Sequence, residues 1–155
     1  MPKITPNVLF ETEALVAAEF YVGLFPNSKI GNVSYCGEAG PLPAGTALAV
    51  DFVLDGEDFT SINCGVAFMF NESFSLRIGC HGQEEVDHYW NALTAGGSEG
   101  RCGWLKDRFG VSWQVTPVEM GRYLGHEDPA KSSLAMQAMM KMSKINLSEF
   151  EEAIR

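Results

Sequence analysis

Hydrophobic and polar positions along the chain follow an order of strand and helix spacings that occurs twice. In the first half, a β-rich segment from Ile4 to Phe10 precedes apolar residues at helical spacing between Ala14 and Phe25. Three further strand patterns follow, at Ser28 to Tyr35, Thr46 to Leu54 and Glu57 to Asn63. This half is therefore predicted to fold as strand, helix and three strands.

Turn-forming residues mark the borders of these segments. Pro6 lacks a backbone N–H, which favours a strand start or an edge strand for the first segment. Pro26 and Asn27 end the helical pattern. Asp55 and Gly56 both tolerate positive φ, so they predict a two-residue hairpin between the last two strands.

The second half repeats this order. Residues Phe74 to Cys80 alternate as in a strand, and Gln83 to Ala95 carry a second amphipathic helical pattern that Gly96-Gly97 ends. Strand-like residues return at Gly100 to Lys106 and at Val111 to Thr116. The sequence therefore predicts two similar modules.

Two more helices are expected beyond these modules. Residues Ala130 to Met142 are rich in methionine, which suits either packing on the second module or the interface of a homodimer. A last helix is expected at Ser148 to Ile154, starting with a box-like pair of Ser148 and Glu151.

Composition and charge limit the class of protein. The 155 residues, 46% of them hydrophobic, suffice for one domain or two fused half-domains. A net charge of -9 argues against nucleic-acid or anionic-membrane partners. The sequence shows neither a secretion signal nor a membrane span, and its four cysteines form no C-x-x-C pair, so we expect a cytoplasmic protein with reduced thiols.

Several phrases in both halves resemble a known family. The chain is similar to the PhnB-like subgroup of the glyoxalase/bleomycin resistance/dioxygenase (vicinal oxygen chelate) superfamily, some of whose members are labelled 3-demethylubiquinone-9 3-methyltransferase. The run from Cys102 to Gln114 is the most specific part. The other matching residues are Phe20-Tyr21, Phe25 to Ser28, Asn63, Gly65, Phe68, Phe70, Gln83 to Asp87, Trp90, Leu93 and Gly96-Gly97.

The resemblance implies an α+β fold. It implies one glyoxalase/bleomycin-resistance/dihydroxybiphenyl-dioxygenase-like domain over residues 1–155, in which paired βαβββ modules form a curved mixed sheet. Module one would span about 4–70, module two about 74–117, and a C-terminal helical extension about 129–155.

Metal-dependent members of this superfamily hold a divalent ion with His, Glu or Gln side chains on the first and last strands of each module. The matching positions here are Ser75 and Gln114 in module two, and Thr5 or Asn7 with Asn63 in module one. Hydroxyl and amide groups are poor ligands for such ions. We therefore expect no metal cofactor, with a divalent metal ion as the alternative.

Strand alternation gives candidate ligand-binding residues. Ser75 and Arg77 share one face of their strand, as Ser112, Gln114 and Thr116 share one face of theirs. If the apolar faces meet the helices, these polar faces line the concave side of the sheet. The alternative is structural, with Arg77 in an ion pair and Gln114 satisfying backbone groups.

The favoured hypothesis is a metal-independent small-molecule binding protein that forms a homodimer and holds its ligand in a sheet-lined cleft. The candidate binding residues are Asn7, Asn63, Ser75, Arg77, Trp104 and Gln114. One alternative is a metal-dependent lyase, isomerase or dioxygenase. The other is a methyltransferase acting on a demethylubiquinone-like substrate, which we disfavour because the glycine cluster at 96–100 follows a helix, whereas nucleotide-type sites place it between a strand and a helix.

Overall fold

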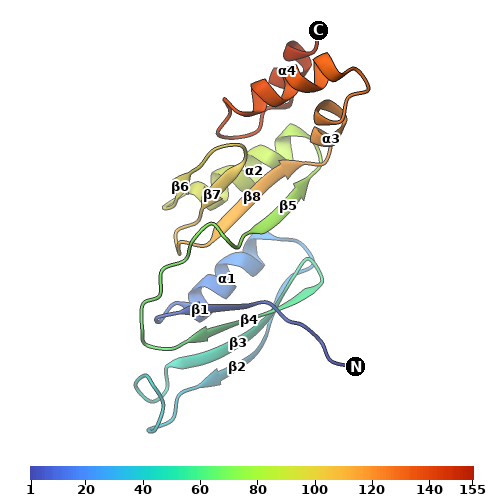
Figure 1. Ribbon diagram of the computed structural model, residues 1–155. Helices are drawn as coiled ribbons and strands as arrows, with labels where there is room; N and C mark the ends of the chain where they lie inside the picture. The colour runs from blue at the N-terminus through green and yellow to red at the C-terminus, as the bar shows by residue number, and fades with distance from the viewer. The chain divides into compact units, whose positions relative to one another are not determined.

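The fold consists of two similar units. The computed structural model describes residues 1–155 and divides into compact units at Met1–Met69 and Phe70–Arg155. Each unit contains one four-stranded mixed sheet with a helix against it (Figure 1). The predicted α+β fold with two βαβββ modules is confirmed. No helix combines the length and the apolar character that a membrane crossing requires.

The first unit closely follows the predicted segments. Its elements are β1 (Asn7–Phe10), α1 (Ala14–Leu24), β2 (Lys29–Tyr35), β3 (Ala47–Leu54) and β4 (Glu57–Asn63), in the sheet order β1-β4-β3-β2. β1 runs parallel to β4, and the other pairs are antiparallel. The predicted hairpin is confirmed, since Asp55 and Gly56 have φ values of 48° and 81°.

Helix α1 packs on one face of this sheet through small residues. Ala14, Ala17 and Ala18 are fully buried, so the helix lies close to β3. No side chain of its own first turn caps the helix. Asn63 of β4 does so instead, because its Oδ1 accepts from the Ala14 N–H at 2.8 Å while its Nδ2 donates to the Ala47 carbonyl at 2.9 Å.

The second unit repeats the arrangement with shorter strands. Its elements are β5 (Leu76–Cys80), α2 (Gly82–Thr94), β6 (Ser98–Glu99), β7 (Trp104–Lys106) and β8 (Ser112–Pro117), in the order β5-β8-β7-β6. The predicted strand at Phe74 begins two residues later, at Leu76. Buried Val86, Trp90 and Leu93 form the face of α2 that packs on β7 and β8.

Asp107 holds the turn between β7 and β8. It is 3% exposed, and its Oδ1 accepts from the backbone N–H groups of Phe109 at 2.8 Å and Val111 at 3.1 Å. Its Oδ2 accepts from the Trp113 indole N–H at 2.8 Å. These three hydrogen bonds hold the turn in place and offset the hydration that the buried carboxylate loses.

Three helices follow the second sheet: α3 (Met120–Leu124), α4 (Pro129–Met139) and α5 (Leu147–Ala153). Their own core consists of Tyr123, Ala135, Met142, Ile145 and Phe150. The five-residue α3 was not predicted, and α4 ends three residues before the predicted Met142.

The predicted start of the last helix is wrong. Asn146, and not Ser148, caps α5, since the Asn146 side chain accepts from the Ser148 N–H at 3.1 Å. Glu151 accepts from the Tyr123 hydroxyl at 3.1 Å, so it does not complete a capping box. The Tyr123 and Phe150 rings are stacked with their centroids 5.2 Å apart, so this side of α5 packs in the C-terminal core.

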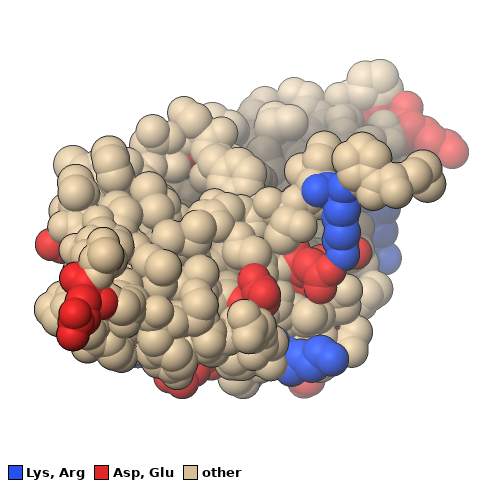
Figure 2. Space-filling model, turned by 90° about the horizontal axis from the view of Figure 1, so that it is seen from below, with Lys and Arg blue, Asp and Glu red and all other residues tan.

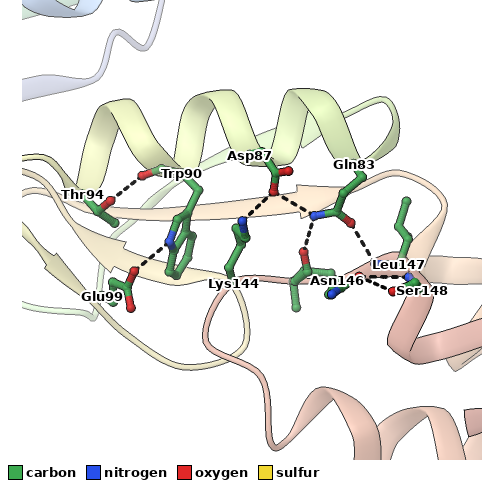
Figure 3. A network of polar contacts seen from close by, with 10 residues as sticks. Gln83, Asp87, Trp90, Thr94, Glu99, Lys144, Asn146, Leu147 and Ser148 are labelled. Carbon is green, nitrogen blue, oxygen red and sulfur yellow. Dashed lines mark hydrogen bonds and ion pairs between the residues drawn. The ribbon is translucent and has the colours of Figure 1, made fainter. Parts of the chain in front are cut away.

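Polar side chains of α2 fasten the segment before α5 (Figure 3). Gln83 Nε2 donates to the Ile145 carbonyl at 3.0 Å, and Gln83 Oε1 accepts from the Leu147 N–H at 2.9 Å. Asp87 forms an ion pair with Lys144 at 2.7 Å. The polar contacts of Asp87 are thus with Lys144 and Gln83.

We expect Asp107→Ala to lower the free energy of unfolding by about 3 kcal/mol, because it leaves three donors without their acceptor. Asp107→Asn keeps one carbonyl oxygen and should cost about half as much. Urea denaturation of the whole chain measures both. Asp128→Ala, which removes one exposed cap bond to Ala130, serves as the comparison and should cost about 1 kcal/mol. Equal midpoints for Asp107→Ala and Asp128→Ala would contradict this account.

Stability should depend on the charge of Asp87 in acid. Hydrogen bonding by Lys144 and then by Gln83 lowers the pKa of Asp87 below its ordinary value of 3.8. A depressed carboxyl pKa contributes stability above the unfolded-state value, and the contribution is lost as pH falls through the folded-state value.

The Tm advantage of the native protein over Asp87→Asn should therefore be constant near neutral pH and shrink below about pH 4. Thermal melts across this range measure it, with Glu84→Gln on the same helix as the control. An advantage that persists unchanged at pH 2 would argue against the ion pair.

Candidate functional site

The face of the second sheet opposite α2 carries a row of polar and aromatic side chains. Arg77 of β5 pairs with Gln114 of β8, and Gln114 in turn pairs with Trp104 of β7. Residues paired across strands point to the same face, so these three side chains lie next to one another. We call Arg77, Gln114 and Trp104 the second row.

The first sheet has an equivalent row. Asn7 pairs with Thr60, and Thr60 pairs with Asp51. These three residues, the first row, lie on the face opposite α1.

The two rows occupy the same place in their modules. Along β1 and β4, the pair Asn7–Thr60 lies three residues before the pair Phe10–Asn63. Along β5 and β8, the pair Arg77–Gln114 likewise lies three residues before the pair Cys80–Pro117. Thr60 is therefore the counterpart of Gln114, and Asn63 is not.

Asn63 faces away from the first row. It lies on the side covered by α1, is 1% exposed, and uses its amide to hold the helix start. Asn7, in contrast, is exposed and donates to the Thr60 hydroxyl at 2.5 Å. Thr60 and Asp51 were not among the predicted binding residues. The alternation of side chains along β4 puts Thr60 and Asn63 on opposite faces, and this was the available signal for Thr60.

A hollow of about 320 Å³ lies beside the first row. It is lined by Thr5, Gly31, Asp51, Phe52, Val53, Asp58, Phe59 and Thr60. Asp58 pairs with the Lys3 ammonium, whereas Asp51 belongs to none of the ion pairs. Hydroxyls and a carboxylate at this hollow favour ligand groups that donate hydrogen bonds.

The first unit is the more acidic of the two. Eight of the 20 acidic side chains, but only two of the 11 basic ones, belong to residues 1–69. In Figure 2 the acidic side chains lie apart from one another on a mostly uncharged face, and the basic ones in the foreground lie beside acidic ones. An anion would therefore meet more favourable charges in the second unit.

Arg77 is oriented by a buried neighbour. Its Nε donates to the Thr116 hydroxyl at 3.0 Å, and that hydroxyl donates to the Ile78 carbonyl at 3.2 Å. Arg77 is exposed and takes part in no ion pair. The structural ion pair considered for Arg77 is therefore absent, and its two terminal nitrogens remain available as donors.

Further polar groups lie around the second row. Gln114 Nε2 donates to the Ser75 hydroxyl at 3.0 Å, which brings two predicted residues together. Ser112 shares the Gln114 face of β8; it is 2% exposed, and its hydroxyl has no hydrogen-bond partner. Lys106, paired with Ser112 across the strands, forms an ion pair with Glu72 at 2.6 Å.

The residues of neither row fit a divalent metal ion. The second row offers a guanidinium, an amide and an indole, and the first row offers only one carboxylate. No three His, Cys, Asp or Glu residues of the chain are grouped so that they could hold a metal ion. Such ions need several convergent imidazole, thiolate or carboxylate ligands, and a neighbouring Arg77 charge opposes their binding.

Comparison with known proteins places this geometry in a family. Residues 2–116 match the family model described as 3-demethylubiquinone-9 3-methyltransferase. A solved structure of a putative 3-demethylubiquinone-9 3-methyltransferase, a PhnB protein from Bacillus cereus, is 35% identical with a TM-score of 0.70. The match covers 76% of this chain and 100% of that one. A search of curated proteins gave no significant match.

More distant structures share the fold. A protein from Pseudomonas aeruginosa is 20% identical with a TM-score of 0.62, over 76% of this chain and 98% of its own. The fosfomycin resistance protein FosX from Listeria monocytogenes, solved with manganese(II) and a dihydroxypropylphosphonic acid, is 13% identical with a TM-score of 0.53, over 75% and 92% of the two chains.

The C-terminal helices lie beyond the family match. Residues 2–116 contain both βαβββ modules almost completely, whereas α3 begins at Met120. The repeated modules, the matched residues and the likeness to the Bacillus cereus protein agree. The chain belongs to the family described as 3-demethylubiquinone-9 3-methyltransferase, the PhnB-like group.

Proposed function

We propose that this protein is a metal-independent small-molecule binding protein that holds an anionic compound on the second row. The observation that carries this proposal is Arg77, an exposed guanidinium with no carboxylate partner in a chain of net charge -9. In so acidic a chain, a cation that lies on a sheet and is oriented by Thr116 is well suited to an incoming anion.

The geometry of Arg77 favours a planar or tetrahedral oxyanion. Because Nε is occupied by Thr116, the two terminal nitrogens remain for a ligand. A guanidinium binds carboxylate, phosphate and phosphonate oxygens through paired, charge-assisted hydrogen bonds. Fixing Nε also lowers the entropy lost when such a ligand binds.

The rest of the row suits a flat organic body attached to that anion. Trp104 is half-buried and presents an aromatic wall two strands away from Arg77. Gln114 lies between them, and its side-chain carbonyl oxygen can accept from a ligand, since its bond to Ser75 uses the amide nitrogen. We therefore favour an aromatic or conjugated carboxylate or phosphonate as the ligand class.

Methyl transfer, which the family description names, has less support from this chain. Gly97 and Gly100 lie against the backbone of β7: a Cβ at Gly97 would be 2.1 Å from the Lys106 carbonyl oxygen, and one at Gly100 would be 2.6 Å from that of Trp104. The need for glycine here is explained by the close approach of β7, so the cluster supplies no argument for a nucleotide-type donor site.

The proposed homodimer stays a prediction. Of the methionines in the predicted helix, Met142 is 4% exposed and Met139 packs on the C-terminal core, whereas Met136 and Met140 are 44% and 57% exposed. Packing within the chain thus explains part of the methionine content.

Arg77→Gln should weaken binding of aromatic carboxylates and phosphonates by tenfold or more, because a charged hydrogen-bond donor contributes about 1.5–3 kcal/mol. We suggest a thermal-shift screen with substituted benzoates and phenylphosphonates in EDTA, followed by calorimetry on the tightest binder. Phosphonates are included because the FosX structure contains one. Lys29→Gln, at an exposed lysine of β2 in the first unit, changes the net charge equally and should leave affinity unchanged. Failure of every compound to raise the Tm of the native protein, or equal binding by Arg77→Gln, would refute the proposal.

Metal removal should not change this binding. Protein purified without chelator should contain well under one equivalent of transition metal by elemental analysis, because neither row provides enough ligands. Added manganese, nickel or iron should shift neither the Tm nor the anion affinity. Stoichiometric metal, or anion binding that requires it, would favour the metal-dependent alternative.

A further inference from the structure

The C-terminal part of the chain contacts the part that matches the family model, and one of these contacts is next to Trp104 of the second row. The C-terminal helices lie beyond residue 116 and therefore outside the matched family model. Two groups of polar contacts join the segment between α4 and α5 to the rest of the second unit: one involves α2, and the other involves the loop between β6 and β7.

At α2, one side chain fixes two backbone groups. Gln83 binds the Ile145 carbonyl at 3.0 Å and the Leu147 N–H at 2.9 Å, and Asp87 accepts from Gln83 Nε2 at 3.0 Å (Figure 3). Lys144 pairs with Asp87, but both side chains are about two-fifths exposed, at 36% and 42%. Gln83 is therefore the stronger of the two restraints, because exposed ion pairs contribute little.

At the β6–β7 loop, the segment that precedes α5 forms backbone hydrogen bonds. The Cys102 N–H donates to the Met142 carbonyl at 2.9 Å, and the Gly103 N–H donates to the Ser143 carbonyl at 2.7 Å. Gly103 has a φ of 85°, and a Cβ there would be 3.1 Å from Ile145 Cγ1. The loop and the C-terminal segment are thus closely fitted to one another.

This contact continues to the binding row. Gly103 directly precedes Trp104, and the Gly103 carbonyl accepts from the Val115 N–H at 2.8 Å. Val115 directly follows Gln114, which is the cross-strand partner of Trp104. The C-terminal segment binds the loop at Gly103, so it helps to hold the backbone just before Trp104 and, through Val115, just after Gln114.

We propose that the C-terminal extension, residues 120–155, is a positioning element for the second row, and that Gln83 is the residue through which α2 holds it there. The extension sets the backbone at Gly103 and Val115 and thereby the relative position of Trp104 and Gln114. The part of this inference that concerns ligand affinity rests on the proposed function. The part that concerns backbone position does not.

Amide hydrogen exchange of Gln83→Ala, followed by NMR, tests the positioning. We expect exchange at Cys102, Gly103 and Val115 to accelerate by tenfold or more, because local opening of the extension exposes their hydrogen bonds. Amides of β3 and β4 in the first unit should keep their rates. Gln137→Ala, at an exposed glutamine of α4, is the matched control and should change none of these rates.

Gln83→Met is a milder second variant, because it keeps the length of the side chain and loses both of its hydrogen bonds to the extension. It keeps the test decisive if Gln83→Ala folds poorly, and it should accelerate the same amides. Unchanged exchange at Gly103 and Val115 in a folded Gln83→Ala protein, or in Gln83→Met if only that variant folds, would overturn the proposal, whatever the anion screen shows.

Ligand affinity then separates this inference from the proposed function. With the tightest binder of the screen, Gln83→Ala should bind several-fold more weakly although Gln83 lies outside the row. Unchanged affinity despite faster exchange would overturn the claim that the extension acts on binding. If no compound binds the native protein, the proposed function fails while the exchange rates still decide the positioning.

Discussion

The parallel pairing of the first strand with the last in each unit is the constraint on which the rest depends. Parallel neighbours cannot be joined by a tight turn, so the chain crosses over through a helix that covers one sheet face. The other face carries the two polar rows, which in the first unit adjoin the apolar side chains of Leu9, Ile62 and Ala49. The same pairing places Asn7 beside Thr60 and Arg77 beside Gln114.

The same arrangement of strands thus carries two different sets of functional groups. The first row combines an amide, a hydroxyl and the Asp51 carboxylate, and the second combines a guanidinium, an amide and an indole. Neither set of side chains alters how the strands pair, because the hydrogen bonds between strands are made by backbone groups. Divergence of binding preference between the repeats therefore needs only substitutions on one sheet face.

Most elements were predictable because their signals are local. Helical spacing and turn residues such as Asp55-Gly56 act within a few positions, and they located both modules. The role of Asn63 was not predictable in this way, because the group that it satisfies belongs to a helix 49 residues away in sequence. Likewise, strand register, which only the folded sheet reveals, brings Asp51 into the first row.

The environments of the three indoles give the molecule an internal optical reporter. Trp90 and Trp113 are 2% and 3% exposed, and each indole N–H is bound to a carboxylate, of Glu99 and Asp107 respectively. Their emission should be insensitive to events on the helix-free face. Trp104 is the one indole on that face, so a change in fluorescence on adding a compound would report on the neighbourhood of Trp104 without any label.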